Sequence, residues 1–157
     1  MKRLWNRRPL LTRLPALLLS VFFLSACAAI ESVNQSLNYV NDATRYIEQV
    51  STAGAELQQM ARDAVNNPDI TAQFQDKLDQ LQTKANEFKQ LDPPAIGEAV
   101  HEKLLSYNEQ LITSVTQFKE SLAAQGFTLE NWEQTGIPSL IENINNIKQQ
   151  LGELGGG

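Results

Sequence analysis

Apolar residues return every three or four positions along almost the whole chain from residue 30 to residue 154. This spacing matches the α-helical repeat of about 3.6 residues, and no stretch of this region alternates apolar and polar residues over a strand's length. The intervening positions are rich in Gln, Asn, Glu and Lys, as is typical of solvated helix faces. The pattern predicts an all-α fold.

The apolar positions fall into four stripes, each the length of one helix. The first comprises Ile30, Val33, Leu37, Val40, Ile47, Val50, Leu57, Met60 and Ala64. The second comprises Ile70, Phe74, Leu78, Leu81, Ala85 and Phe88. The third comprises Ile96, Val100, Leu104, Tyr107, Leu111, Val115, Phe118 and Leu122. The fourth comprises Ile137, Leu140, Ile141, Ile144, Ile147, Leu151 and Leu154.

Residues that favour turns separate the stripes. Asn66-Asn67-Pro68-Asp69 follows the first stripe, and Asn67 or Asp69 is suited to cap the second helix. Asp92-Pro93-Pro94 ends the second stripe, with Asp92 as the expected N-cap of the third helix. Gly54, inside the first stripe, could kink or divide that helix, and the sequence does not decide whether the helix is continuous there.

The last connection is longer than the others. Gly126 is expected to close the third helix, and residues 127–137 to form a connection with one short helical turn around Trp132. Short amphipathic helices joined by turns predict an antiparallel bundle of about four helices over residues 30–154, with residues 155–157 as a flexible tail. Heptad-like spacing also suits an intermolecular coiled coil, but the short, separated helices favour a bundle within one chain.

The amino-terminal 26 residues follow a different pattern. Five cations and no acid lie between Met1 and Arg13, and a short apolar run extends from Leu14 to Leu24. This run is too short to span a bilayer as a stable helix, and five cations before it argue against a buried helix of a cytosolic protein. A basic segment, an apolar core and then small residues are typical of a secretory signal peptide, here residues 1–26.

Leu24-Ser25-Ala26-Cys27 resembles a bacterial lipobox. In such signals the cysteine thiol receives diacylglycerol, with chains such as palmitate, and a peptidase cuts before the cysteine, here between Ala26 and Cys27. We therefore expect lipid on Cys27, residues 27–29 as a short tether, and a location on the extracytoplasmic face of the cell membrane. Cys27 is the only cysteine, so the alternatives are an intermolecular disulfide or a buried free thiol.

Cleavage would also change the charge of the protein. Removing 26 of 157 residues leaves 131, and losing five of the 13 basic residues leaves eight against 18 acids, a formal net charge of −10. Such a chain lacks the cationic face that nucleic acids need, and it should not lie flat on anionic lipid. The acidic surface could attract cationic partners, but keeping the domain soluble is the explanation that we prefer.

The sequence offers little for catalysis. His101 is the only histidine, and we expect it to be a partly exposed residue on a helix face and not part of a triad. Metal sites usually need several His or Cys ligands, and Asp76 and Asp79 do not lie in an EF-hand loop. Glu98 and Glu102, four residues apart, are the kind of pair that normally faces solvent. We therefore expect no enzyme, no metal and no cofactor.

Two groups of residues are candidates for binding. Asn34, Asn38 and Asn41 share helical spacing beside Tyr39 and Tyr46, and could recognise a polar ligand such as a glycan or make interhelical hydrogen bonds. Phe127, Leu129 and Trp132 gather in the long connection, where they could anchor a partner or cover the open end of the bundle. The candidate binding surface is therefore Asn34, Asn38, Asn41 and Trp132.

Three stretches carry a family resemblance: Val33-Asn34-Gln35-Ser36-Leu37-Asn38-Tyr39-Val40-Asn41-Asp42-Ala43, Leu91-Asp92-Pro93-Pro94 and Tyr107-Asn108-Glu109-Gln110-Leu111. They resemble a family of small lipoproteins of unknown function from Bacillus and related Gram-positive bacteria, a DUF6376-like domain. The resemblance covers most of residues 30–122 and weakens after Gly126. It implies a lipobox, a helical ectodomain and no assigned activity, and it assigns no catalytic residue.

Together these features favour a non-enzymatic binding or interaction module of the cell envelope, held to the membrane by lipid on Cys27. Its partner would be an envelope protein or a wall polymer, and nucleic acid is excluded. The alternative is a regulatory or stress-response envelope lipoprotein without a stable partner.

Overall fold

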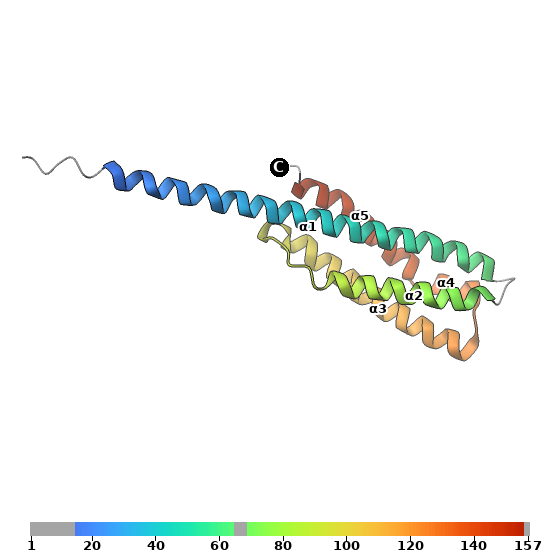
Figure 1. Cartoon of the computed structure of the whole chain (residues 1–157). Coiled ribbons are helices and arrows are strands. Elements are labelled where there is room, and N and C mark those ends of the chain that lie inside the picture. Colours follow the sequence, from blue (N-terminus) through green and yellow to red (C-terminus); the bar gives the residue numbers. More distant parts are fainter. Residues whose placement is uncertain (1–14, 65–68, 156–157) are drawn as a thin grey trace, which may run out of the picture. The chain divides into compact units, whose positions relative to one another are not determined.

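The computed structural model describes the backbone of residues 15–64 and 69–155 and the side chains of residues 33–64 and 70–154 (Figure 1). These residues form α1 (Pro15–Ala64), α2 (Asp69–Phe88), the 3-10 turn η1 (Ala95–Gly97), α3 (Glu98–Gln125), α4 (Leu129–Gln134) and α5 (Ile137–Gly155). The chain divides into two units, Met1–Gln35 and Ser36–Gly157. The first is described as helix from Pro15, and the second contains the remaining helices.

The second unit is an all-α bundle, and its described residues contain no strand, which confirms the predicted fold class. Gly126 ends α3 as expected: it has a positive φ of 77°, and its N–H bonds to the carbonyl of Leu122. Thr128 caps α4 by accepting a hydrogen bond from the N–H of Asn131 at 3.1 Å. The short helix predicted around Trp132 is therefore present.

Side-chain pairs give the direction of each helix within the second unit. Glu56 of α1 pairs with Lys77 of α2, whereas Tyr46, earlier on α1, meets Phe88, later on α2, so the two helices are antiparallel. The pairs Glu48–Lys148 and Ser51–Asn145 show that α1 and α5 are antiparallel too. The pairs Tyr39–His101 and Tyr46–Asn108 show that α1 and α3 run in the same direction. These directions show a bundle in which the long helices α1, α2, α3 and α5 alternate in direction along the chain.

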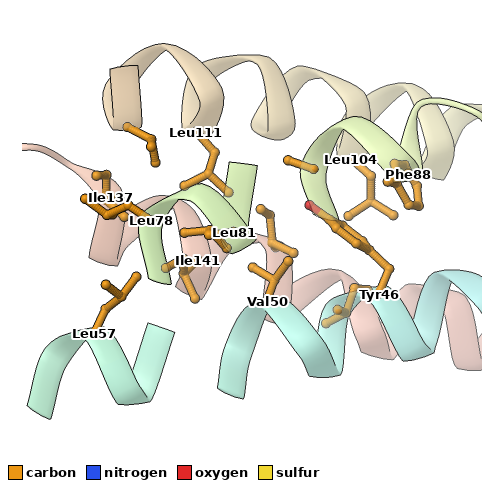
Figure 2. Close-up of a cluster of buried hydrophobic side chains, with 14 of the residues drawn as sticks. Tyr46, Val50, Leu57, Leu78, Leu81, Phe88, Leu104, Leu111, Ile137 and Ile141 are labelled. Carbon is orange, nitrogen blue, oxygen red and sulfur yellow. The ribbon is translucent and has the colours of Figure 1, made fainter. Parts of the chain in front are cut away.

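One continuous core fills the bundle. Figure 2 shows side chains from all four long helices meeting in it, among them Leu57 of α1, Leu81 of α2, Leu111 of α3 and Ile137 of α5. Each of these four is at most 1% exposed. Burying a large aliphatic side chain contributes roughly 1.5–3 kcal/mol, so this interface supplies the main stabilisation of the bundle.

Gly54 does not divide the first helix, because α1 is continuous from Pro15 to Ala64. Its role is to let α5 approach: a Cβ on Gly54 would lie 2.7 Å from Cγ2 of Ile141. Of the two possibilities raised by the sequence, division of the helix is therefore excluded. The absence of a side chain serves a helix–helix contact that local sequence cannot reveal.

The start of α3 also differs from the prediction. Asp92 was expected to cap this helix, but the helix is preceded by η1, whose first hydrogen bond runs from the Gly97 N–H to the Pro94 carbonyl at 2.8 Å. Pro93 and Pro94 keep the chain extended beyond Asp92, which lies exposed in the connection. Three residues of the predicted stripes are also exposed: Val33, Leu37 and Ile96.

Candidate functional site

The lipid-attachment residue lies in the first unit. The backbone of Ala26 and Cys27 belongs to α1, but their side chains, and all of residues 1–14, lie outside the described residues. The structure therefore does not test the predicted signal peptide, its cleavage or the lipid. These remain predictions from the sequence.

The predicted asparagine surface is solvent-exposed. Asn38 and Asn41 lie exposed on α1 in the second unit, and Asn34 is exposed in the first. Among the described side chains, none of the three hydrogen-bonds to another helix. The interhelical role weighed for them is therefore not seen, and their amides are accessible to a polar ligand.

Trp132 does not lie on any surface. It is 0% exposed, and its indole makes an edge contact with Phe74 at 5.1 Å and a tilted contact with Phe118 at 5.6 Å between ring centroids. Phe127 joins the same cluster through Phe74. The aromatic residues of the long connection thus cover one end of the bundle, and Trp132 must be removed from the candidate binding surface.

A second polar feature is buried between α1, α2 and α3. The hydroxyl of Tyr39 lies 3.2 Å from Nδ1 of His101, and seven residues further along both helices the hydroxyl of Tyr46 donates to Oδ1 of Asn108. Phe88 of α2 stacks on His101 at 5.1 Å and packs against Tyr46 at 4.6 Å. These five residues form what we call the polar layer.

The polar layer corrects the prediction for His101, which is 6% exposed and not a surface residue. Burial lowers the pKa of His101 from its ordinary value of 6.5, while the charges of Asp92 and Glu102 act in the opposite direction. Burial raises the pKa of Tyr39 to about 12 and that of Tyr46 still higher. At neutral pH the layer is therefore uncharged.

The register of α3 could have revealed the layer. The buried positions of this helix are His101, Leu104, Asn108, Leu111, Val115, Phe118 and Leu122, in regular steps of three and four. Three residues before Leu104, the same steps reach His101. Four residues after Leu104, they reach Asn108. The apolar stripe instead includes Val100 and Tyr107, and both are only partly buried.

A groove follows the seam between α1 and α2. It has a volume of about 610 Å³, and its apolar lining residues are the partly buried Ala53 and the buried Leu81. The Lys77–Glu56 ion pair, at 2.5 Å, bridges the two helices along it. Its lining residues are Arg45, Glu48, Gln49, Thr52, Ala53, Glu56, Lys77, Asp79, Gln80, Leu81, Thr83 and Lys84.

The carboxylates considered at the sequence level are dispersed. Glu98 and Glu102 are exposed on α3, and Asp79 is paired with Lys119. Within the described ranges, no group of three or more His, Cys, Asp or Glu side chains is placed to hold a metal ion. None of the helices described is long and apolar enough to cross a membrane.

Fold and surface together define a small all-α bundle protein with a buried polar layer and an open groove between its first two helices. A family of unknown function, DUF6376, matches residues 39–154, which is most of the second unit. The chain belongs to this family.

A relative from Bacillus subtilis (strain 168), described as the uncharacterized lipoprotein YybP, is 28% identical over 129 residues. The match covers 82% of this chain and 87% of the relative. No solved structure matches the chain. The family resemblance seen in the sequence is thereby confirmed.

Proposed function

We propose that this chain is a lipid-anchored lipoprotein of the extracytoplasmic face of the cell membrane. The observation that supports this most directly is Leu24-Ser25-Ala26-Cys27, which follows a basic and then an apolar segment. The Bacillus subtilis relative, itself described as a lipoprotein, supports the same assignment. Two or three acyl chains on Cys27 would hold the protein far longer than one chain, which binds only reversibly.

The bundle then acts as a non-enzymatic binding module of the envelope. Its one histidine is buried, and no group of three or more described His, Cys, Asp or Glu side chains is placed to hold a metal ion. Its exposed candidates for contact are the groove between α1 and α2 and the amides of Asn38 and Asn41. Such surfaces suit an envelope protein or a wall polymer.

The groove is the better candidate for the contact. Ala53 is a small residue that leaves space between the helices, and it is only partly buried. Polar side chains such as Thr52 and Gln80 line the sides, and they can supply hydrogen bonds that set specificity. A groove with both apolar and polar lining residues suits the recognition of a partner.

Anchoring is tested by Cys27→Ala in cells. We expect the variant to keep its signal peptide or to be released without lipid, whereas the parent chain partitions into detergent. A Cys27→Ala protein that is cut before residue 27 and still partitions like the parent would show that the lipobox assignment is wrong.

Binding is tested by placing a photocrosslinking amino acid at Thr52 or Gln80 in the anchored protein, with exposed Glu120 of α3 as the control position. We expect a discrete adduct from the two groove positions and none from Glu120. The absence of adducts at all three positions would contradict the groove and favour a regulatory or stress-response lipoprotein without a stable partner.

A further inference from the structure

The polar layer contains two similar contacts, each between a tyrosine of α1 and a polar side chain of α3. Only one of the two, the contact with His101, can take up a proton near neutral pH. Tyr39 meets His101 and Tyr46 meets Asn108, with 62 residues between the partners in each case. Both partners on α3 are buried, and both tyrosines come from α1. The second copy is therefore a natural control for the first, because an asparagine amide does not titrate.

The surroundings of His101 favour the neutral ring. In the tautomer that carries its hydrogen on Nε2, Nδ1 accepts a hydrogen bond from the Tyr39 hydroxyl, 3.2 Å away. The Tyr39 ring meets the imidazole edge-on at 5.7 Å, and Phe88 covers its face. Protonation would turn Nδ1 from an acceptor into a donor and would leave a cation in a site that is 6% exposed.

The charged groups around the ring offset only part of the free-energy cost of burying a protonated imidazole. Asp92 lies in the connection after α2, and Glu102 is the neighbour of His101 on α3; both carboxylates favour the protonated ring. From α1 the titratable group that faces the ring is Tyr39, whose phenol stays neutral far above physiological pH. From α2 the facing side chain is the neutral Phe88. Desolvation remains the largest effect, so the closed contact prefers the neutral ring.

We propose that His101 is an acid-sensitive latch that holds the segment of α1 from Tyr39 to Tyr46 against α2 and α3. The neutral ring keeps the segment closed through Tyr39 and Phe88, and protonation releases it. Tyr46 and Asn108 limit the opening, because their contact does not respond to the proton. This inference goes beyond the proposed binding role and does not depend on it, although an extracytoplasmic location would expose the latch to external pH.

The sign of the pH dependence follows from the direction of the pKa shift. The pKa of His101 is lowered in the closed state, whereas an opened, solvated imidazole has the ordinary value of 6.5. The closed state is therefore fully favoured above pH 6.5 and loses stability as the pH falls toward the lowered pKa. Linkage of one proton allows the opening equilibrium to rise by at most about tenfold for each pH unit in that window.

The test uses the full chain in detergent micelles, without a histidine tag. His101 is the only histidine, so its imidazole NMR signals report its pKa without ambiguity. We expect that pKa to lie below 6.5, and we expect hydrogen exchange, corrected for intrinsic rates, to show amides 39–46 opening more as the pH falls from about 8 to about 5. A His101 pKa at or above the ordinary 6.5 would overturn the proposal.

The matched variant is His101→Asn, which copies the contact that Asn108 already makes. We expect the opening of amides 39–46 in this variant to be independent of pH over the same range, while α4 and α5 exchange as in the parent. If His101→Asn opens with the same pH dependence as the parent, another group is responsible and the latch is refuted. Should this variant fail to fold, the parent still decides the question: the opening of amides 39–46 must follow the linkage expected from the His101 pKa measured by NMR, and opening that does not change with pH would refute the latch.

A second variant separates the hydrogen bond from burial. Tyr39→Phe removes the hydroxyl but keeps a ring against the imidazole. We expect the segment to open more at every pH, with the pH dependence retained, because desolvation is its main cause. Unchanged opening at the alkaline end of the range would show that Tyr39 does not hold the segment and would contradict its part in the latch.

Discussion

Gly54 of α1 faces Ile141 of α5 so closely that a Cβ on Gly54 would lie 2.7 Å from Cγ2 and 2.9 Å from Cδ1 of Ile141. Contacts this short do not occur between real side chains, so any other residue at position 54 must move Ile141 or separate the helices. Ile141 is itself 8% exposed and belongs to the core. The distance between α1 and α5 therefore depends on an absent side chain.

A comparison of two glycines tests this contact. Gly54→Ala is expected to destabilise the bundle by about 1–3 kcal/mol through overpacking, despite the better helix propensity of alanine. Gly152→Ala is the control, because Gly152 is also helical and a Cβ added there would meet no atom within 4 Å. It should stabilise the protein by up to about 1 kcal/mol. Urea unfolding followed by circular dichroism measures both, and equal effects would contradict the close approach.

The core of α3 gives a second prediction. Leu104→Ala and Leu111→Ala should each reduce the free energy of unfolding by about 2–5 kcal/mol, because both side chains are 0% exposed. Glu109→Ala, on the exposed face of the same helix, should change it by less than about 0.5 kcal/mol. Small and equal effects at all three positions, measured by urea unfolding, would mean that α3 does not pack as described.

The contact between Tyr46 and Asn108 predicts strong coupling between these residues. Tyr46→Phe removes the donor to Oδ1 of the fully buried Asn108, whose Nδ2 has no protein partner among the described residues, and should cost about 1–3 kcal/mol. Combining Tyr46→Phe with Asn108→Leu removes the buried polar atoms together, so the double variant should be more stable than Tyr46→Phe alone. A double-mutant cycle of unfolding free energies measures this, and strict additivity would argue against the hydrogen bond.

Trp132 is expected to matter for stability and not for direct contact with a partner. Trp132→Ala should cost about 3–5 kcal/mol, because it opens a cavity among Phe74, Phe118 and Phe127. Glu133→Ala, at the exposed neighbouring position, is the control and should leave stability nearly unchanged. Limited proteolysis should show faster cleavage near α4 in the tryptophan variant only. Unchanged stability in Trp132→Ala would contradict its burial.

The sequence alone predicted the helices better than their contacts. The repeat of apolar residues, the turn residues and Gly126 are local signals, and they correctly predicted an all-α bundle with a short helix at Trp132. Burial at the ends of the stripes was less predictable. Leu37 and Ile96 fit the apolar repeat and are nevertheless 43% and 65% exposed, because a stripe can extend beyond the neighbouring helices that would cover it.

The polar layer was missed for a physical reason. A histidine or an asparagine in a helix normally lies in solvent, since burying it without a partner costs free energy. The partners of His101 and Asn108 are Tyr39 and Tyr46, 62 residues earlier, and no local pattern links positions so far apart. Likewise the groove between α1 and α2 arises from packing of two helices and has no motif of its own.

The alternating directions of the helices have a practical consequence for labelling. Glu48 of α1 meets Lys148 of α5, so the last turns of α5 run back toward the end of the bundle at which Ser36 enters it. A fluorescent protein fused after residue 157 would therefore crowd the same end as the incoming chain. At the opposite end, where α3 finishes, Phe127 contacts Phe74 and Thr128 caps α4, so an epitope inserted between Gln125 and Leu129 would disrupt these contacts.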